Sequence, residues 1–286
     1  MRAELHCHSI YSRGTKVLIE GLNRPKEIVA YAKSLGIKIL ALTDHDTMEG
    51  VSEATREARR VGILLIPGEE VSTKQGHILA LGINEPVESN RDILETIDEI
   101  HEQGGVAIAA HPFDLRRQGC GSNAIYCDAI EVFNALDIER ASNWRAKRFA
   151  LRNSMPITAG SDAHMLAMLG HGVTIFPDCY TVDEVIRAIK KGKTKIEGKY
   201  ISTSLIVEWA TRRLKYSYYY VRNYVLHNYS KPKRTLSLRL LKLVQRSPGK
   251  IDYLFKAMGY FAAGVVISYA IFRNLLIGSI ADLLGR

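Results

Sequence analysis

Two histidines stand one residue apart near the start of the chain, in the stretch MRAELHCHS. In a β-strand, residues i and i+2 point to the same face, so a strand through Leu5 would present His6 and His8 side by side. Two imidazoles on one face can chelate a metal ion, but two ligands alone do not make a site. If this pair binds a metal, the rest of the chain must supply further ligands.

Short apolar runs alternate with longer amphipathic segments as far as about residue 195, which is typical of repeated β–α units. We expect strands near 2–6, 37–42, 63–67, 77–82, 106–110, 129–133, 156–159 and 172–176. We expect helices near 25–35, 50–61, 90–104, 138–153 and 181–192. Units of this kind close most naturally into a barrel, and an open doubly wound sheet is the alternative.

The polar residues with the most useful chemistry lie at the boundaries of these expected strands. Six of the nine histidines do so, in the stretches HCH, TDHD, GH, AHP and GSDAH, and acids lie in GEE and GSD. Barrel enzymes have their active sites at the carboxyl ends of the strands. Unrelated residues would be scattered over helices and loops as well, so the sequence predicts a site that holds more than one metal ion.

The composition is that of a globular protein, with 286 residues of which 47% are hydrophobic. The four cysteines have neither CxxC spacing nor the density of a disulfide scaffold. The first residues are charged and polar, unlike the apolar run of a signal peptide. These features favour a cytoplasmic location.

The motifs HCH, TDHDTMEG, PGEEVST, GHILALG, AHP and GSDAH, in this order, resemble the PHP (polymerase and histidinol phosphatase) superfamily of metal-dependent phosphoesterases. The resemblance covers about residues 2–195 and implies a distorted (β/α)7 TIM-like barrel, in agreement with the strand pattern. It implies hydrolysis of phosphate esters by a hydroxide that bridges two metal ions. Two or three divalent cations are expected, and the mixed nitrogen and oxygen ligands suit zinc, manganese or iron.

The resemblance also implies which residues bind the first two metals. Glu70 would bridge them, because it lies two residues after Gly68 as in the family's glycine-x-glutamate pattern. Glu69 would then point away from the site and be an exposed acid. The implied ligands of the two metals are His6, His8, Glu70, His77, His111 and Asp162.

A third metal in many members uses an acid or a histidine after the first motif together with the equivalents of His45 and His164. Arg13 stands where that ligand is expected, and an arginine cannot bind a cation, which puts the third metal in question. Without a third metal, His45 or His164 could donate a proton to the leaving group, and His164 is favoured.

Three side chains are candidates for substrate binding. The planar guanidinium of Arg13 suits a phosphate, and Arg116 could recruit an anionic substrate. Asn134 could bond the substrate or a metal-bound water. The ordinary alternatives are a loop arginine, a solvated helix start and a strand cap.

The expected substrate is a phosphorylated small molecule, either a phosphomonoester or a nucleotide. A nucleic-acid exonuclease or phosphodiesterase is the main alternative enzyme, with nucleic acid the less favoured partner. A degenerate PHP metal-binding module is the alternative from another class.

The β–α alternation stops near residue 200, so we expect a PHP domain at 1–198 and a basic, mainly helical extension at 199–286. Residues 200–286 carry 14 Lys or Arg against three acids, and residues 257–272 carry no charge. The segment RTLSLRLLKLVQR predicts a basic amphipathic helix. Three interpretations of the extension stay open: a helix packed on the barrel, a membrane-associated segment, and an arm for nucleic acid or a partner. An anionic membrane surface would fit the charge, with attachment to the inner face of the membrane.

Overall fold

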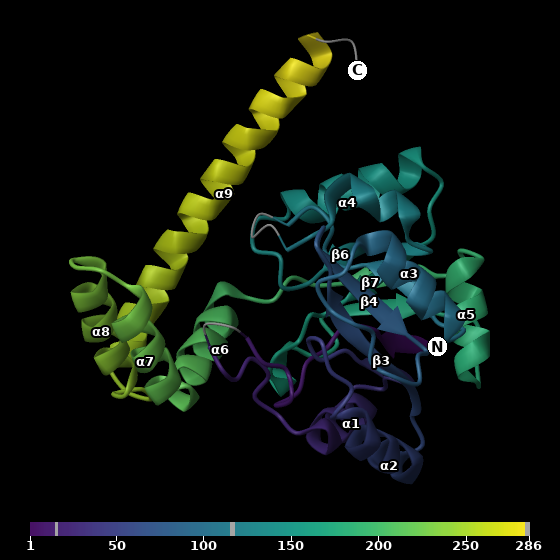
Figure 1. Cartoon of the computed structure of the whole chain (residues 1–286), viewed down its shortest axis with the longest axis horizontal. Coiled ribbons are helices and arrows are strands. Elements are labelled where there is room, and N and C mark those ends of the chain that lie inside the picture. The colour runs from purple at the N-terminus through teal and green to yellow at the C-terminus, as the bar shows by residue number, and fades with distance from the viewer. Residues whose placement is uncertain (15–16, 115–117, 284–286) are drawn as a thin grey trace.

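The computed structural model describes the chain except residues 15–16, 115–117 and 284–286, and from residue 273 it describes only the backbone of the last helix. Nine strands form one sheet in the order β7-β6-β5-β4-β3-β2-β1-β8-β9. The strands are β1 (Arg2–Glu4), β2 (Ile39–Leu42), β3 (Leu64–Ser72), β4 (His77–Leu81), β5 (Val106–Ala109), β6 (Ala129–Asn134), β7 (Ile157–Gly160), β8 (Gly172–Ile175) and β9 (Lys195–Gly198). The helices around them are α1 (Pro25–Ser34), α2 (Val51–Val61), α3 (Ile93–Glu102), α4 (Ala141–Arg152) and α5 (Val182–Lys190) (Figure 1).

The sheet curls until its strands β7 and β8 lie side by side, which makes a nearly closed barrel. The Thr174 hydroxyl accepts a hydrogen bond from Ala159 N and donates one to Ala159 O, each 2.9 Å long. The backbones also touch at two glycines, because a Cβ on Gly172 would lie 2.1 Å from Gly160 O. The predicted fold class, a distorted TIM-like barrel, is confirmed.

Strand direction departs from a regular barrel at two places. Strands β1 to β3 are mutually parallel, as are β5 to β7, but β4 is antiparallel to both β3 and β5, and β8 is antiparallel to β1. The amino end of β4 therefore opens at the same mouth as the carboxyl ends of β3 and β5. His77, the first residue of β4, is placed there by this reversal.

Within the barrel, the predicted strands and α-helices match the observed ones to within a few residues, with two exceptions. Strand β3 runs on to Ser72, because residues 68–72 pair with β4. Strand β9 was not predicted; it is a short edge strand with mostly exposed residues that pairs with β8.

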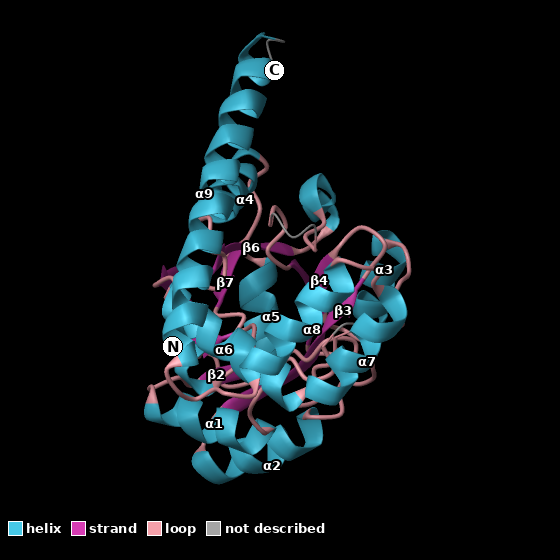
Figure 2. Cartoon of the chain, turned by 90° about the vertical axis from the view of Figure 1, so that its left-hand side faces the viewer, coloured by secondary structure: helices cyan, strands magenta, loops and turns pink. Residues whose placement is uncertain are grey.

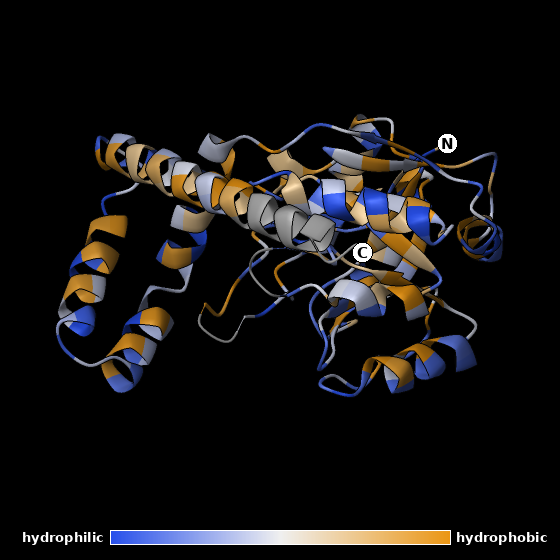
Figure 3. Ribbon diagram, turned by 90° about the horizontal axis from the view of Figure 1, so that it is seen from above, coloured by the Kyte–Doolittle hydropathy of each residue, from blue (hydrophilic) through white to orange (hydrophobic). Residues whose placement is uncertain are grey.

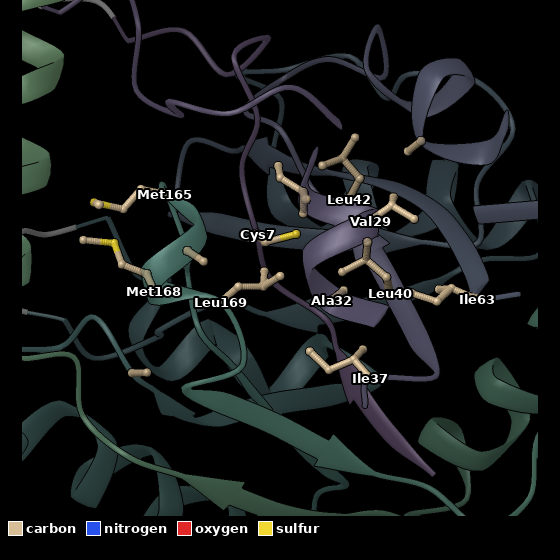
Figure 4. Packing of buried hydrophobic residues seen from close by; sticks show 14 of the residues in the cluster. Cys7, Val29, Ala32, Ile37, Leu40, Leu42, Ile63, Met165, Met168 and Leu169 are labelled. Carbon is tan, nitrogen blue, oxygen red and sulfur yellow. The ribbon is translucent and has the colours of Figure 1, made fainter. Parts of the chain in front are cut away.

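One apolar cluster packs α1 against the outer face of β2 (Figure 4). It contains Val29 and Ala32 of α1, Leu40 and Leu42 of β2, and Cys7. Cys7 is fully buried and points away from the neighbouring histidines, as expected from the alternation of a strand. A second cluster lines the barrel interior and is covered by the apolar face of α5, with Val185, Ile186 and Ile189. This apolar layer confines the polar residues to the other mouth of the barrel.

Glu69 is buried, so the expectation of an exposed acid was wrong. Its carboxylate accepts a 2.6 Å hydrogen bond from Val87 N, because the segment after β4 covers this face of β3. Burial raises the pKa of Glu69 to about 7.

Four helices follow the barrel: α6 (Thr203–Tyr216), α7 (Tyr218–Asn228), α8 (Lys233–Val244) and α9 (Ile251–Leu283). The predicted amphipathic helix is α8. Figures 1 and 2 show α6 beside the barrel, with α7 and α8 farther out and α9 projecting well beyond them. In the described part of the chain, one helical stretch has the length and apolar composition of a membrane span, Ile251–Phe272.

Candidate metal centre

His6 and His8 follow β1, which ends at Glu4, and they lie side by side at the open mouth of the barrel, both buried. The Nε2 atoms of the two rings approach the same carboxylate oxygen of Asp162, at 3.6 and 3.2 Å. Asp162 is held next to them by a backbone bridge between Cys7 and Ala163. The His-x-His pair therefore converges on an acid that is more than 150 residues away in the sequence.

Glu70 lies at the centre of the cluster, with five imidazoles around its carboxylate. Its Oε2 lies 3.2 Å from His6 Nε2, 3.3 Å from His8 Nε2 and 3.1 Å from His45 Nδ1. Its Oε1 lies 2.8 Å from His77 Nδ1 and 2.9 Å from His111 Nε2. Each oxygen thus faces a different set of nitrogens, which is the arrangement of a carboxylate that bridges two cations.

Nearby positive charges and hydrogen bonds keep the carboxylates of Glu70 and Asp162 ionised although both are buried. Burial raises the pKa of Glu70, but the charges of His45, His77 and His6 outweigh it and hold that pKa well below its usual value. Burial likewise raises the pKa of Asp162, and the charge of His6 and the hydrogen bond from His8 outweigh it and hold that pKa well below its usual value. A cation in the cluster would act on both acids in the same direction as these imidazoles.

Three of the histidines have one ring nitrogen fixed by a group outside the centre. His6 Nδ1 lies 3.1 Å from Glu131 Oε1, and His8 Nδ1 lies 3.0 Å from Ser12 Oγ. His164 Nδ1 donates to the carbonyl of Asp162 at 2.9 Å. Metal-binding histidines are oriented in this way, because the bond at one nitrogen sets the tautomer and aims the other at the metal.

The donor atoms stand at the spacing that a metal requires. Four groups, each of three residues, have ligand atoms within 4.8 Å of one another: His6, His8 and Glu70; His6, His111 and Asp162; His45, Glu70 and His77; and His8, His45 and His164. Ligands about 2.1 Å from a zinc ion lie roughly 3.4 Å from each other in a tetrahedral site. The Glu70 oxygens lie 2.8–3.3 Å from the five imidazole nitrogens around them, which is close to this spacing, so the residues present fit bound divalent cations.

Glu20 is an acid of this site that the sequence reasoning missed. Its Oε2 lies 3.3 Å from His45 Nε2, beside the group formed by His8, His45 and His164. Burial raises its pKa, but the hydrogen bond and charge of His45 outweigh this and lower it to about 2. The signal was available, because Glu20 is the only acid between His8 and Glu27.

Glu131 was missed as well. It lies in the apolar strand AIEVFN, where an acid is unusual, and its two oxygens hold His6 Nδ1 at 3.1 Å and His111 N at 2.8 Å. Asn134, from the end of the same strand, is fully buried and donates to Glu131 Oε2 and Asp162 Oδ2 at 3.1 and 3.3 Å. These contacts place Asn134 beneath the proposed ligands as a group that orients them.

Of the two arginines expected to bind substrate, Arg13 does not lie at the centre. Arg13 is exposed and is not among the residues that line the cavity. Arg116 lies outside the described residues. Among the described residues, Arg213 of α6 lines the cavity, and its guanidinium lies 3.8 Å from Glu20 and 4.1 Å from the centre of the Trp209 ring.

A cavity of about 530 Å³ opens above the cluster. Its floor carries carboxylates and imidazoles, and the facing side is largely apolar. The polar residues are Glu20, His45, Glu70, His77, His111, Asp162 and His164, with Asp114, Gln118, Asp137, Glu139 and Arg213 at the sides. The apolar residues are Leu136, Ile138, Ile206, Trp209, Ala210 and Val266.

Trp209 connects α6 to this site. Its Nε1 donates a 2.8 Å hydrogen bond to the carbonyl of Glu20, and its ring lies 4.5 Å from the His164 ring, centre to centre.

We expect Trp209→Ala to lower the free energy of unfolding by about 3–5 kcal/mol, because the loss of a buried indole leaves a large cavity. Urea unfolding followed by circular dichroism measures this. The matched control is Trp144→Ala, since Trp144 is 57% exposed; equal effects of the two substitutions would contradict the packing role of Trp209.

The amino-acid sequence of this chain is similar to those of several known proteins. A family model described as PHP-associated matches residues 140–194. The uncharacterized protein MJ1587 of Methanocaldococcus jannaschii is 36% identical over 141 residues, which are 47% of this chain and 82% of that protein. A 3′,5′-nucleoside bisphosphate phosphatase of Chromobacterium violaceum is 31% identical over 142 residues, which are 48% of this chain and 47% of the phosphatase.

A solved structure shares the fold. It is a candidate metal-dependent phosphoesterase from Bifidobacterium adolescentis with 19% sequence identity and a TM-score of 0.50. The match covers 68% of this chain and 96% of that one.

Proposed function

Because the chain belongs to the PHP superfamily of metal-dependent phosphoesterases, we propose that it hydrolyses a phosphate ester of a small molecule or a nucleotide. The observation that carries this proposal is the position of Glu70, whose two oxygens each face a separate set of imidazole nitrogens. The cavity volume of about 530 Å³ supports a small substrate, since small-molecule sites measure about 300–1,000 Å³.

We assign the ligands of two divalent cations from these contacts. His6, His8 and Asp162 would hold the first cation together with Glu70, and His77 and His111 would hold the second together with Glu70. Cations held there would lower the pKa of water and neutralise charge on the phosphoryl oxygens. Nitrogen and oxygen donors of this kind suit zinc, manganese or iron.

We further propose that Glu20 supplies the acid of a third cation site with His45 and His164, in place of the ligand whose position Arg13 occupies. Glu20→Gln is expected to lower the metal content by one ion per chain, because an amide removes the negative charge that favours a cation. Metal analysis by mass spectrometry after equilibration with manganese measures the loss. The control is Glu49→Gln, an exposed acid; an unchanged metal content in Glu20→Gln would refute the assignment.

His164 fits the role of a ligand better than that of the expected proton donor. Its Nδ1–H is engaged by the carbonyl of Asp162, so its Nε2 carries a lone pair. Burial and the charge of His8 lower the pKa of His164 to about 3, which leaves the ring neutral at physiological pH. We therefore propose His45, which lines the cavity, as the proton donor when the third cation is absent.

The near-complete set of ligands supports an enzyme over a degenerate metal-binding module. The cavity size favours a mononucleotide or smaller ester over a nucleic-acid strand.

The basic extension supports contact with an anionic membrane surface, and we propose a cytoplasmic protein attached to the inner face of the membrane.

The test is a panel of phosphate esters assayed with metal-loaded protein and with His111→Ala. The panel contains phosphomonoesters, nucleotides, a nucleoside bisphosphate and single-stranded nucleic acids. We expect phosphate release from small esters that chelators abolish and that His111→Ala lowers at least about a hundredfold. Equal hydrolysis by wild type and variant would rule the proposal out, and preferential cleavage of the nucleic acids would favour the exonuclease alternative.

A further inference from the structure

The apolar side of the cavity is built largely by helices outside the barrel. Ile206, Trp209 and Ala210 come from α6, and Val266 comes from α9. These side chains face the histidines and carboxylates across the cavity. A substrate bound between the two sides would have its phosphate at the polar floor and an apolar group against α6 and α9.

Helix α9 touches the rest of the chain along one narrow stripe. Phe255, Gly259, Ala263, Val266 and Ala270 recur every three or four residues, so they lie on one face of the helix. Ala263 and Ala270 are buried, and a Cβ on Gly259 would lie 2.1 Å from Val207 of α6. Small residues in the stripe allow this close packing.

The other faces of α9 are apolar and exposed. Only 11% of its most apolar 18-residue window is buried, and Figure 3 shows hydrophobic residues spread along the helix. The large exposed side chains are Tyr253, Leu254, Met258, Tyr260, Phe261, Val265, Ile267, Tyr269, Ile271 and Phe272. A continuous apolar surface of this kind marks an interaction site.

The charge and the length of the extension favour a lipid bilayer as the partner. Residues 200–286 carry 14 Lys or Arg against three acids, which attracts anionic lipid. The 22 residues of Ile251–Phe272 extend over about 33 Å, which gives a long apolar surface that can lie along one face of a bilayer. Helices that are apolar on nearly all faces are typical of a lipid environment.

We propose that the substrate is a phosphate ester of a long-chain amphiphile, presented from a bilayer that covers the exposed faces of α9. This inference rests on the proposed phosphoesterase activity and specifies its substrate class. The apolar chain packs against Trp209, Ile206 and Val266, and the phosphate reaches the floor of the cavity. Water attacks phosphorus, the bond between phosphorus and the alcohol oxygen breaks, and that oxygen takes a proton, which yields inorganic phosphate and a lipid alcohol.

The first experiment uses soluble alkyl phosphates from ethyl to octyl, each below its micelle concentration, with the full-length metal-loaded protein. We expect kcat/KM to rise about two- to fourfold for each added methylene, until the alkyl chain covers the apolar side of the cavity. Val266→Ser should flatten this dependence, because Val266 lines the cavity. The matched control is Val265→Ser, whose side chain is 54% exposed on the neighbouring face and which should keep the wild-type dependence.

The second experiment presents phosphatidic acid in phosphatidylcholine vesicles. We expect the protein to float with these vesicles and to release phosphate from them. If the protein does not float with the vesicles and analytical ultracentrifugation shows a dimer, a second copy of the chain covers α9. That result would overturn the proposal that a bilayer covers this helix. Equal kcat/KM for ethyl and octyl phosphate would overturn the substrate class. If neither ester is hydrolysed and metal removal changes nothing, the proposed phosphoesterase function itself has failed.

Discussion

Glu70→Gln is expected to lower kcat for phosphate-ester hydrolysis by at least about a thousandfold and to reduce the bound metal by two ions. The carboxylate of Glu70 faces His6, His8 and His45 with one oxygen and His77 and His111 with the other. A glutamine keeps the shape but has one acceptor oxygen, no charge, and an NH₂ group that would point at a cation or at an imidazole. Both proposed metal sites would therefore lose the Glu70 carboxylate that they share.

The effect is measured by steady-state kinetics together with metal analysis of the purified variant. Glu69→Gln is the matched control, because Glu69 is the preceding residue of the same strand and points to the opposite face. Its carboxylate accepts from Val87 N, and a glutamine can still accept that bond, so metal content and activity should be retained. A Glu70→Gln protein that binds two metals and keeps its activity would disprove the bridging role.

Gly172→Ala is expected to lower the free energy of unfolding by at least about 3 kcal/mol, or to prevent folding. The added Cβ would lie 2.1 Å from Gly160 O and 2.5 Å from Gly160 C, and backbone atoms cannot swing aside as a side chain can. Strands β7 and β8 would have to separate where the barrel closes. Gly160 itself lies against the site, since a Cβ there would lie 2.4 Å from His6 Cβ, so this separation should also weaken metal binding.

Urea unfolding of the purified protein measures the effect of Gly172→Ala. Gly104→Ala is the control, because Gly104 has φ +80° and no atom within 4 Å of the added Cβ. Its cost is that of a left-handed backbone alone, about 1–2 kcal/mol. If both variants unfold at the same urea concentration, close contact between β7 and β8 does not limit this fold.

The strand boundaries and most proposed ligands could be predicted from the sequence, since both depend on local patterns. Alternation of apolar and amphipathic segments sets the strands and helices, and a polar residue that ends an apolar run stands at a strand end whatever the rest of the chain does. His6, His8, His45, His111 and Asp162 all follow that pattern, whereas Glu70 lies inside β3, which continues to Ser72. The fold class and the prediction of a clustered polar site came from it together with the family motifs.

Other features depended on contacts between distant segments. His77 begins its strand instead of ending it, and only the antiparallel direction of β4 brings it to the same mouth. Glu20 reaches His45 from a loop whose carbonyl is held by Trp209, 189 residues later. The sequence shows Glu20 as an isolated acid and His77 at a strand boundary, but it does not encode which side chains they meet.

The sequence by itself determined which residues can bind metal ions and near which strand boundaries they lie. Residue type and strand position are properties of single residues and short runs. The tertiary structure decided which acid stands by His45, that Glu69 is buried, and that α6 and α9 face the proposed metals across the cavity. Those outcomes depend on how elements pack, and packing is set by surfaces that meet only after the chain has folded.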